Sequence, residues 1–262
     1  MGSEVRGGTW GMAKGHAMSS GALVQFLVSI GADEVASDTP LPWWAPPKET
    51  APVPAVAPIE AAPPLKKPDP LVSFSSLQAL RAALDTVTDF ALKQTATQMV
   101  FGEGPLNPDI MVIGEAPGNE EDQSGRPFVD SSGQLLNQIL AAAGYAREHC
   151  YITTIIPWRP PGNRAPTPHE VAQMLPFLRE HIRLVAPKAL VLLGGVVAKA
   201  VLNNDTSMMR LRGRLYPLEG TDIVVAPTFH PASLLRTPSQ KQQVWEDVLR
   251  LKQHLAGGHS LN

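Results

Sequence analysis

The sequence holds very little cysteine: Cys150 is the single thiol among its 262 residues. One thiol cannot form a disulfide within the chain, and it cannot supply the several cysteine ligands of a structural metal centre or an iron–sulfur cluster. A strong charge of one sign is also missing, because 22 basic and 24 acidic residues leave a formal net charge of −2. Composition therefore excludes a disulfide framework, and the overall charge does not by itself indicate a nucleic-acid-binding protein.

The N-terminal third has no hydrophobic run long enough to cross a membrane as a helix. Its most apolar stretch, residues 22–30, could be the core of a signal peptide, but acidic residues follow it without a convincing cleavage site. We favour a short helix within an N-terminal extension of residues 1–39. The Pro- and Ala-rich residues 40–72 predict an extended linker. The remaining residues, 73–258, are long enough to bury one sizeable core.

Residues 73–258 alternate between helical and strand patterns. Short apolar or β-branched runs at 110–113, 151–156, 189–193 and 223–226 predict four buried strands. Apolar residues at helical spacing lie between them, with N-terminal caps expected at Ser76 and in the Thr167-Pro168-His169-Glu170 box. This order predicts an α/β protein, a three-layer sandwich in which helices flank a central, mainly parallel four-stranded sheet.

A polar loop follows the first of these strands. Gly114 ends the strand, and Pro117-Gly118 prevents regular structure from continuing. Between Gly114 and the aromatic Phe128 the loop carries four acidic residues, Glu115, Glu120, Glu121 and Asp122. Loops at the carboxyl ends of parallel strands are where open α/β sheets place their ligand sites. From the residues alone, a functional site and an ordinary solvated acidic loop both remain open.

Three segments carry a resemblance to a known family. They are Gly114-Glu115-Ala116-Pro117-Gly118 with Glu121-Asp122, Gly125 and Pro127-Phe128-Val129; Arg159-Pro160-Pro161-Gly162-Asn163-Arg164; and His230-Pro231-Ala232-Ser233-Leu234-Leu235-Arg236. In this order they resemble the motifs of the family 4 uracil-DNA glycosylases, over roughly residues 90–255. The resemblance implies a DNA repair enzyme that flips uracil out of DNA and hydrolyses its N-glycosidic bond, leaving an abasic site.

The resemblance also implies roles for individual residues. Glu115 is expected to activate water and stabilise charge, Glu121 to support the loop or the water, and His230 to contact the base. The base-binding residues would be Gly114, Ala116, Phe128, Asp130, Thr154 and Asn163. DNA would be held by Arg164, Ser233 and Arg236, with the pair Leu234-Leu235 as a wedge in the duplex.

Each of these roles has a simpler alternative. Phe128 could be a core side chain, His230 a structural group and either glutamate a surface charge. Leu234-Leu235 could be an apolar pair leading a helix, and Asn163 a turn residue.

The sequence departs from the family in three places. By position, the four cysteines of the family's iron–sulfur cluster are replaced by Val87, Phe90, Trp158 and Met174, so we expect no cofactor and no metal. The family's base-reading asparagine is replaced by Thr154, which predicts weaker discrimination and excision of other deaminated bases beside uracil. Asp130 replaces a glycine and would add a carboxylate beside the pocket.

These departures leave a second function open, a damaged-DNA or abasic-site binding protein with weak or no turnover. For either function the expected partner is uracil-containing or otherwise damaged DNA, with no membrane partner. We expect a monomer in the bacterial cytoplasm, associated with the nucleoid.

Overall fold

The computed structural model describes residues 73–257. The predicted N-terminal extension (1–39) and linker (40–72) lie outside the described residues, as does position 258 at the predicted end of the domain. Their boundaries remain predictions.

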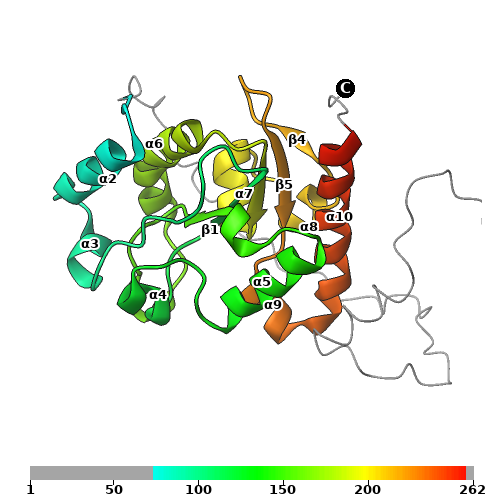
Figure 1. Cartoon of the computed structure of the whole chain (residues 1–262). Coiled ribbons are helices and arrows are strands. Elements are labelled where there is room, and N and C mark those ends of the chain that lie inside the picture. Colours follow the sequence, from blue (N-terminus) through cyan, green and yellow to red (C-terminus); the bar gives the residue numbers. More distant parts are fainter. Residues whose placement is uncertain (1–72, 258–262) are drawn as a thin grey trace, which may run out of the picture. The chain divides into compact units, whose positions relative to one another are not determined.

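The centre of the described domain is a five-stranded sheet with strand order β2-β1-β3-β5-β4. Four of the strands are parallel: β1 is Ile110–Gly114, β2 Tyr151–Thr154, β3 Ala189–Leu193 and β5 Val224–Thr228. All four are fully buried, as expected for strands covered on both faces. The predicted α/β class and mainly parallel sheet are confirmed (Figure 1).

The sheet differs from the prediction at its margins. A fifth strand, β4 (Tyr216–Pro217), was not predicted because two residues leave no alternating pattern; it pairs antiparallel with β5. Strand β2 ends at Thr154 and not at Ile156. Strand β5 continues through Pro227, where we expected it to stop. Proline is tolerated there because β4 pairs only with Val224 and Val225, so β5 is an edge strand at Pro227.

Helices cover the sheet as two layers (Figure 1). One apolar cluster packs side chains of β1 and β3 against α2 (Leu77–Thr86), α3 (Ala91–Thr95), α6 (Pro168–Val185) and α7 (Gly195–Leu202). A second cluster packs the alternate side chains of the same strands against α5 (Ser131–Ala142) and α10 (Lys241–Gly257). Because successive strand residues point to opposite faces, two clusters mean three layers, as predicted.

Shorter elements connect these layers. They are α4 (Asn119–Ser124), η1 (Arg147–His149), η2 (Pro161–Asn163), α8 (Met208–Leu211), α9 (Pro231–Arg236) and η3 (Pro238–Gln240). The predicted final helix beginning at Pro238 is therefore a 3-10 turn followed by α10, and α9 was not predicted as a separate helix. The predicted caps are confirmed: Ser76 caps α2, and Thr167 forms a capping box with Glu170.

The single thiol lies in the second cluster. Cys150 is 1% exposed, and burial raises its pKa to about 11. Within the described residues, no helix is both long and apolar enough to span a bilayer.

Candidate active site

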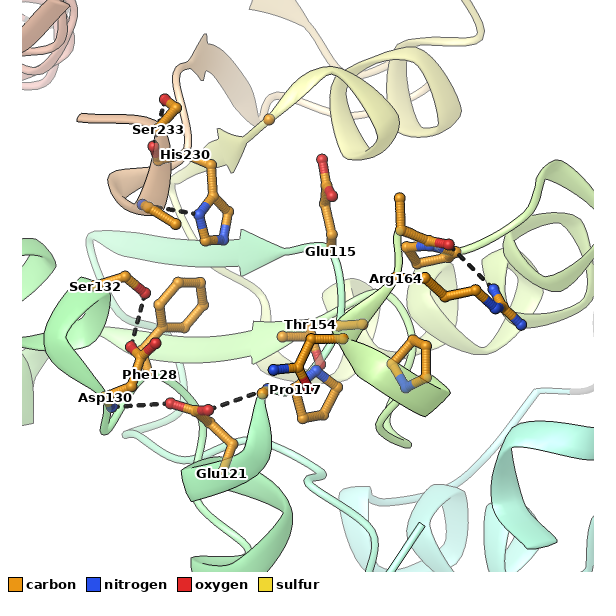
Figure 2. A pocket seen from close by; sticks show the side chains of 18 of the residues that line it. Glu115, Pro117, Glu121, Phe128, Asp130, Ser132, Thr154, Arg164, His230 and Ser233 are labelled. Atoms are coloured by element: carbon orange, nitrogen blue, oxygen red, sulfur yellow. Dashed lines mark hydrogen bonds between the residues drawn. The ribbon is translucent and has the colours of Figure 1, made fainter. Parts of the chain in front are cut away.

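A cleft of about 600 Å³ opens at the carboxyl edge of the sheet. Each parallel strand contributes to it at or just after its end: Glu115 follows β1, Thr154 ends β2, Gly194 follows β3 and His230 follows β5. The convergence of the strand-end loops on one edge is thus observed (Figure 2). Of the residues proposed from the sequence, the cleft lining includes Glu115, Ala116, Glu121, Phe128, Asp130, Thr154, Asn163, Arg164, His230, Ser233 and Arg236.

The Glu115 carboxylate stands at the junction of β1 and α7. It accepts a hydrogen bond from the backbone N–H of Val196 in the first turn of α7, where the helix dipole favours negative charge. Burial nevertheless raises the pKa of Glu115, and the Val196 N–H only partly offsets this. Gly194 makes room for the carboxylate, because a Cβ there would lie 2.5 Å from Glu115 Oε1. A carboxylate with a raised pKa is well suited to accept a proton from water.

The imidazole of His230 has a defined hydrogen-bonding polarity. Its Nδ1 accepts the backbone N–H of Ala232 at 3.2 Å, which caps the start of α9. Burial lowers the pKa of His230 to about 4, although the charge of Asp130 opposes this shift. The ring is therefore neutral at physiological pH, and its proton must reside on Nε2 because Nδ1 is an acceptor. His230 thus offers a neutral N–H donor.

Phe128 lies next to His230 and lines the cleft. The two rings are stacked with centroids 5.6 Å apart. Phe128 is only 5% exposed and also belongs to the second apolar cluster. It is therefore both a core side chain and part of the cleft wall. Gly114 is required beneath the ring, since a Cβ there would lie 2.5 Å from the Phe128 ring. This is how Gly114 contributes to the site.

Two of the predicted site carboxylates are already used in holding the backbone. Glu121 is buried and accepts the N–H groups of Gly118, Val129 and Asp130 at 2.8–3.0 Å. Of the two roles expected for Glu121, the structure therefore favours support of the loop. Asp130 caps α5 by accepting the Gly133 N–H at 2.9 Å. We had expected Asp130 only as an extra pocket carboxylate; it lines the cleft, but one of its oxygens is committed to this cap.

Thr154 is buried at the end of β2, and its hydroxyl donates to the Ile156 carbonyl at 2.7 Å. The sequence suggested a rotatable hydroxyl that could donate or accept. Because its one hydrogen is engaged, the oxygen retains only acceptor capacity.

The Asn163 and Arg164 side chains are engaged within the protein. Asn163 adopts the left-handed backbone of a turn residue, and its Oδ1 accepts from Arg159 at 2.7 Å. Arg164 forms a two-pronged ion pair with Glu170 and holds the pKa of that carboxyl at about 2. We expected Arg164 to face phosphate, and contact with DNA would have to compete with this pair.

The segment after β5 corrects the predicted wedge. Leu234 is 0% exposed, because α9 turns it into the core, whereas Leu235 is 48% exposed. Only Leu235 presents its side chain to solvent, so a wedge formed by both leucines is wrong for this structure. Ser233 donates to the His230 carbonyl at 2.7 Å and so stabilises this turn.

Some cleft residues were missed from the sequence. They include Pro117, Gly118, Ser132, Pro160, Gly194, Gly195, Met208 and Phe229. The Gly194-Gly195 pair could have been found, because it follows a buried strand as the Glu115 loop does. Met208 carries no comparable local signal.

The residues at the family's cluster positions do not fit an iron–sulfur cluster. Phe90, Trp158 and Met174 are each 2% exposed, and Val87 packs on the same apolar cluster. Phe90 and Trp158 make a direct ring contact, with centroids 5.4 Å apart. Across residues 73–257, no group of three or more His, Cys, Asp and Glu is placed to hold a metal ion.

Comparison with known proteins agrees with the geometry of the cleft. The model of the uracil DNA glycosylase superfamily matches residues 101–249. A type-4 uracil-DNA glycosylase from Thermotoga maritima is 40% identical over 159 residues, which cover 60% of this chain and 82% of the relative. A type-4 uracil-DNA glycosylase from Archaeoglobus fulgidus is 36% identical over 166 residues, which cover 61% of this chain and 83% of the relative. A type-5 uracil-DNA glycosylase from Pyrobaculum aerophilum is 32% identical over 165 residues, which cover 56% of this chain and 72% of the relative. The matched residues make up more than half of this chain, so the chain belongs to the uracil-DNA glycosylase superfamily.

Proposed function

We propose that this protein is a monofunctional DNA glycosylase, which hydrolyses the N-glycosidic bond of uracil in DNA and leaves an abasic site. The observation that carries the proposal is the pairing of two groups in one cleft: a carboxylate whose pKa is raised, Glu115, and a neutral N–H donor, His230. Loss of a base anion from a sugar needs both. A protein that only bound damaged DNA would not need this pair.

The proposed mechanism starts with a base extruded from the duplex into the cleft. The Phe128 ring offers it an apolar face. As the C1′–N1 bond breaks, its electron pair moves onto the base, and the Nε2–H of His230 donates to the base oxygen that gains charge. The sugar becomes an oxocarbenium ion, which the ionised Glu115 stabilises. Glu115 then accepts a proton from the water that adds to C1′.

A direct test is alkali-dependent cleavage of an oligonucleotide that contains one uracil. Wild-type protein should convert the uracil to an alkali-sensitive site in single-turnover conditions. Glu115→Gln should slow this conversion by at least about 100-fold while retaining DNA binding. Glu120→Gln is a matched control, because Glu120 lies on the surface of α4 in the same loop. Wild-type protein that binds the oligonucleotide but never cleaves its glycosidic bond would favour the binding function.

The acceptor at Thr154 supports a wider base range within this function. An acceptor suits the ring N–H that uracil, hypoxanthine and xanthine all carry beside a carbonyl, whereas cytosine and adenine present a bare ring nitrogen. A single acceptor can pair with only one group of the base, whereas the family's asparagine offers both a donor and an acceptor and could pair with two. We therefore expect excision of hypoxanthine and xanthine beside uracil. Thr154→Asn should narrow the range toward uracil in single-turnover assays; an unchanged base profile would refute this role of Thr154.

The DNA partner is expected to meet the cleft rim through Leu235 and Arg236. Leu235 is an exposed apolar side chain that directly precedes Arg236, and Arg236 lines the cleft. We also propose that the protein acts in the cytoplasm as a monomer; light scattering with and without a uracil-containing duplex would test the oligomeric state.

A further inference from the structure

The loop that carries Phe128 is held in an unusual backbone conformation. Phe128 has φ = +53°, a left-handed region that side chains larger than that of asparagine seldom adopt. Its carbonyl packs tightly on the start of α5, since a Cβ at Gly133 would lie 2.0 Å from the Phe128 oxygen. Such a conformation persists only where the surroundings determine it.

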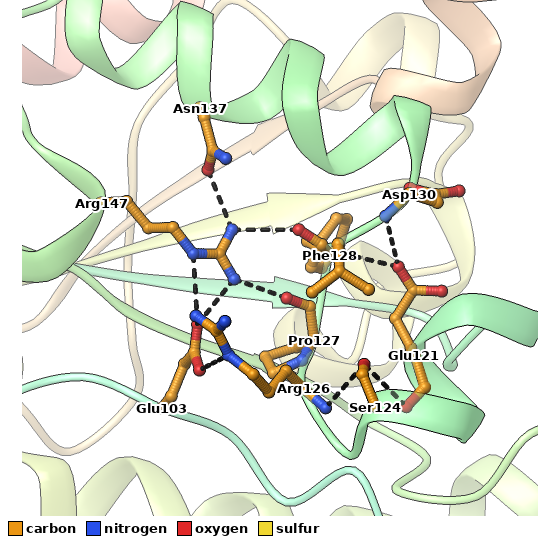
Figure 3. A network of polar contacts seen from close by, with 10 residues as sticks. Glu103, Glu121, Ser124, Arg126, Pro127, Phe128, Asp130, Asn137 and Arg147 are labelled. Carbon is orange, nitrogen blue, oxygen red and sulfur yellow. Dashed lines mark hydrogen bonds and ion pairs between the residues drawn. The ribbon is translucent and has the colours of Figure 1, made fainter.

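One side of the loop is held by Arg147, which lies in η1 between α5 and β2 (Figure 3). Its guanidinium donates to the Phe128 carbonyl at 3.0 Å and to the Pro127 carbonyl at 2.6 Å. It also donates to Asn137 Oδ1 on α5 at 2.9 Å. The planar fork of an arginine suits this task, because several donors point in fixed directions. Arg147 thus ties two successive loop carbonyls to the neighbouring helix.

Glu103 holds Arg147 in place from behind. Its Oε1 accepts from Nε and Nη2 of Arg147 at 3.2 and 2.8 Å. The backbone of Glu103 is itself fixed, since it pairs with Ile152 of β2 through two hydrogen bonds. Burial alone would raise the pKa of Glu103, but the guanidinium groups of Arg126 and Arg147 lower it, so the carboxylate stays charged.

The other side of the loop is held by Glu121, as described above. Its carboxylate accepts the N–H groups of Val129 and Asp130, directly after Phe128 (Figure 3). The loop is therefore fixed through its carbonyls by a cation and through its amides by an anion. Arg147 supplies the half of this arrangement that lies away from the cleft.

We infer that Arg147, supported by Glu103, is a positioning residue that sets the Phe128 ring for base stacking without contacting the substrate. This inference rests on the proposed function, because the ring must stack on a base for its position to affect the rate. It also requires that Arg147 act through Phe128 and not through general stability.

The test is a double-mutant cycle on single-turnover uracil excision, with Arg147→Ala, Phe128→Ala and the double variant. Arg147→Ala should slow excision by roughly 10- to 100-fold, comparable to the loss of one base-stacking contact. In the Phe128→Ala background the same change should slow it by less than about 2-fold, because the ring it positions is gone. Independent slowing in both backgrounds would overturn the inference.

Two further variants separate positioning from stability. Arg126→Ala is the matched control: Arg126 also pairs with Glu103, at 2.8 Å, but its side chain makes no hydrogen bond to the Phe128 loop among the contacts in residues 73–257. Its rate should stay within about 2-fold of wild type, and an equal loss would refute the inference. Arg147→Lys keeps the charge beside Glu103 but lacks the fork. Arg147→Lys should therefore melt near the wild-type temperature yet excise uracil slowly. If Arg147→Ala does not fold, Arg147→Lys takes its place in the double-mutant cycle.

Failure of the proposed function would look different. Wild-type protein would then leave uracil in place, and no variant would alter a rate. The loop effect would still be measurable by amide hydrogen exchange at Val129 and Asp130. Arg147→Ala should speed this exchange and Arg126→Ala should not; unchanged exchange in Arg147→Ala would overturn the positioning role by itself.

Discussion

Gly194 leaves the space that the Glu115 carboxylate occupies, so a single added methyl group tests how far catalysis depends on the position of that carboxylate. A Cβ at Gly194 would lie 2.5 Å from Glu115 Oε1, whereas ordinary contact begins at 3.4 Å. The carboxylate must therefore move by about 0.9 Å or leave its place at the start of α7. Misplacement of a catalytic group by about 1 Å costs on the order of 100-fold in rate. We expect Gly194→Ala to slow single-turnover uracil excision by roughly that factor.

The same substitution also affects stability. Gly194 has φ = +100°, which an L side chain adopts only with strain of about 1–3 kcal/mol. The assay must therefore use temperatures well below the melting point and a parallel measurement of folded fraction. Gly195→Ala is the matched control, because its added Cβ would meet nothing nearer than Met208 Cβ at 4.0 Å. Folded Gly194→Ala protein that excises uracil within about 3-fold of wild type would refute our account of Glu115.

Four other predictions follow from the described geometry. The rate of excision should fall as the pH is lowered, with the midpoint of this fall at a pH above 4.5, because burial raises the pKa of Glu115 above that value. Glu115→Gln should abolish this pH dependence, and an unchanged dependence in the variant would contradict the role assigned to Glu115. Burial lowers the pKa of His181, a buried residue of α6, to about 4, whereas the unfolded chain has a pKa of about 6.5 and binds the proton first as the pH falls. Urea unfolding should therefore show lower stability at pH 5 than at pH 7, by about 2 kcal/mol for His181 alone, and His181→Phe should reduce the difference. Leu235→Ala should slow excision in duplex DNA more than in single strands, where no base stack must be opened; equal effects on both DNA forms would exclude a wedge at Leu235. Leu234→Ala should instead lower the stability of the fold by about 2–5 kcal/mol. Treatment with a metal chelator should leave the excision rate unchanged, and a loss that added iron restores would disprove metal-independent catalysis.

The sequence predicted the framework of the site because the relevant signals are local. Four apolar runs identified the parallel strands, and the rule that loops meet at their carboxyl ends placed Glu115 and His230 on one edge. Thr154 was expected inside a strand, and only the family resemblance singled it out. The capping box at Thr167 was equally readable, because proline at the first helical position and glutamate at the third leave few alternatives.

What the sequence could not supply were contacts between distant segments. Nothing local shows that Arg147 reaches the carbonyls of a loop twenty residues earlier, or that Glu103 lies behind it. The burial of Leu234 depends on α9, a six-residue helix with no periodic pattern to predict it. Asp130 is a different case: an aspartate directly before a helical pattern is a common cap, so its role at the start of α5 was readable from the local sequence.

The buried thiol of Cys150 has a consequence for how this protein meets oxidants. Thiols react with peroxide and alkylating agents as thiolates, and a pKa of about 11 together with 1% exposure leaves almost none of that form accessible. Reaction of this thiol in the native molecule is therefore confined to the moments when the structure around the start of β2 opens. The rate at which a thiol reagent labels Cys150 then measures how often that happens.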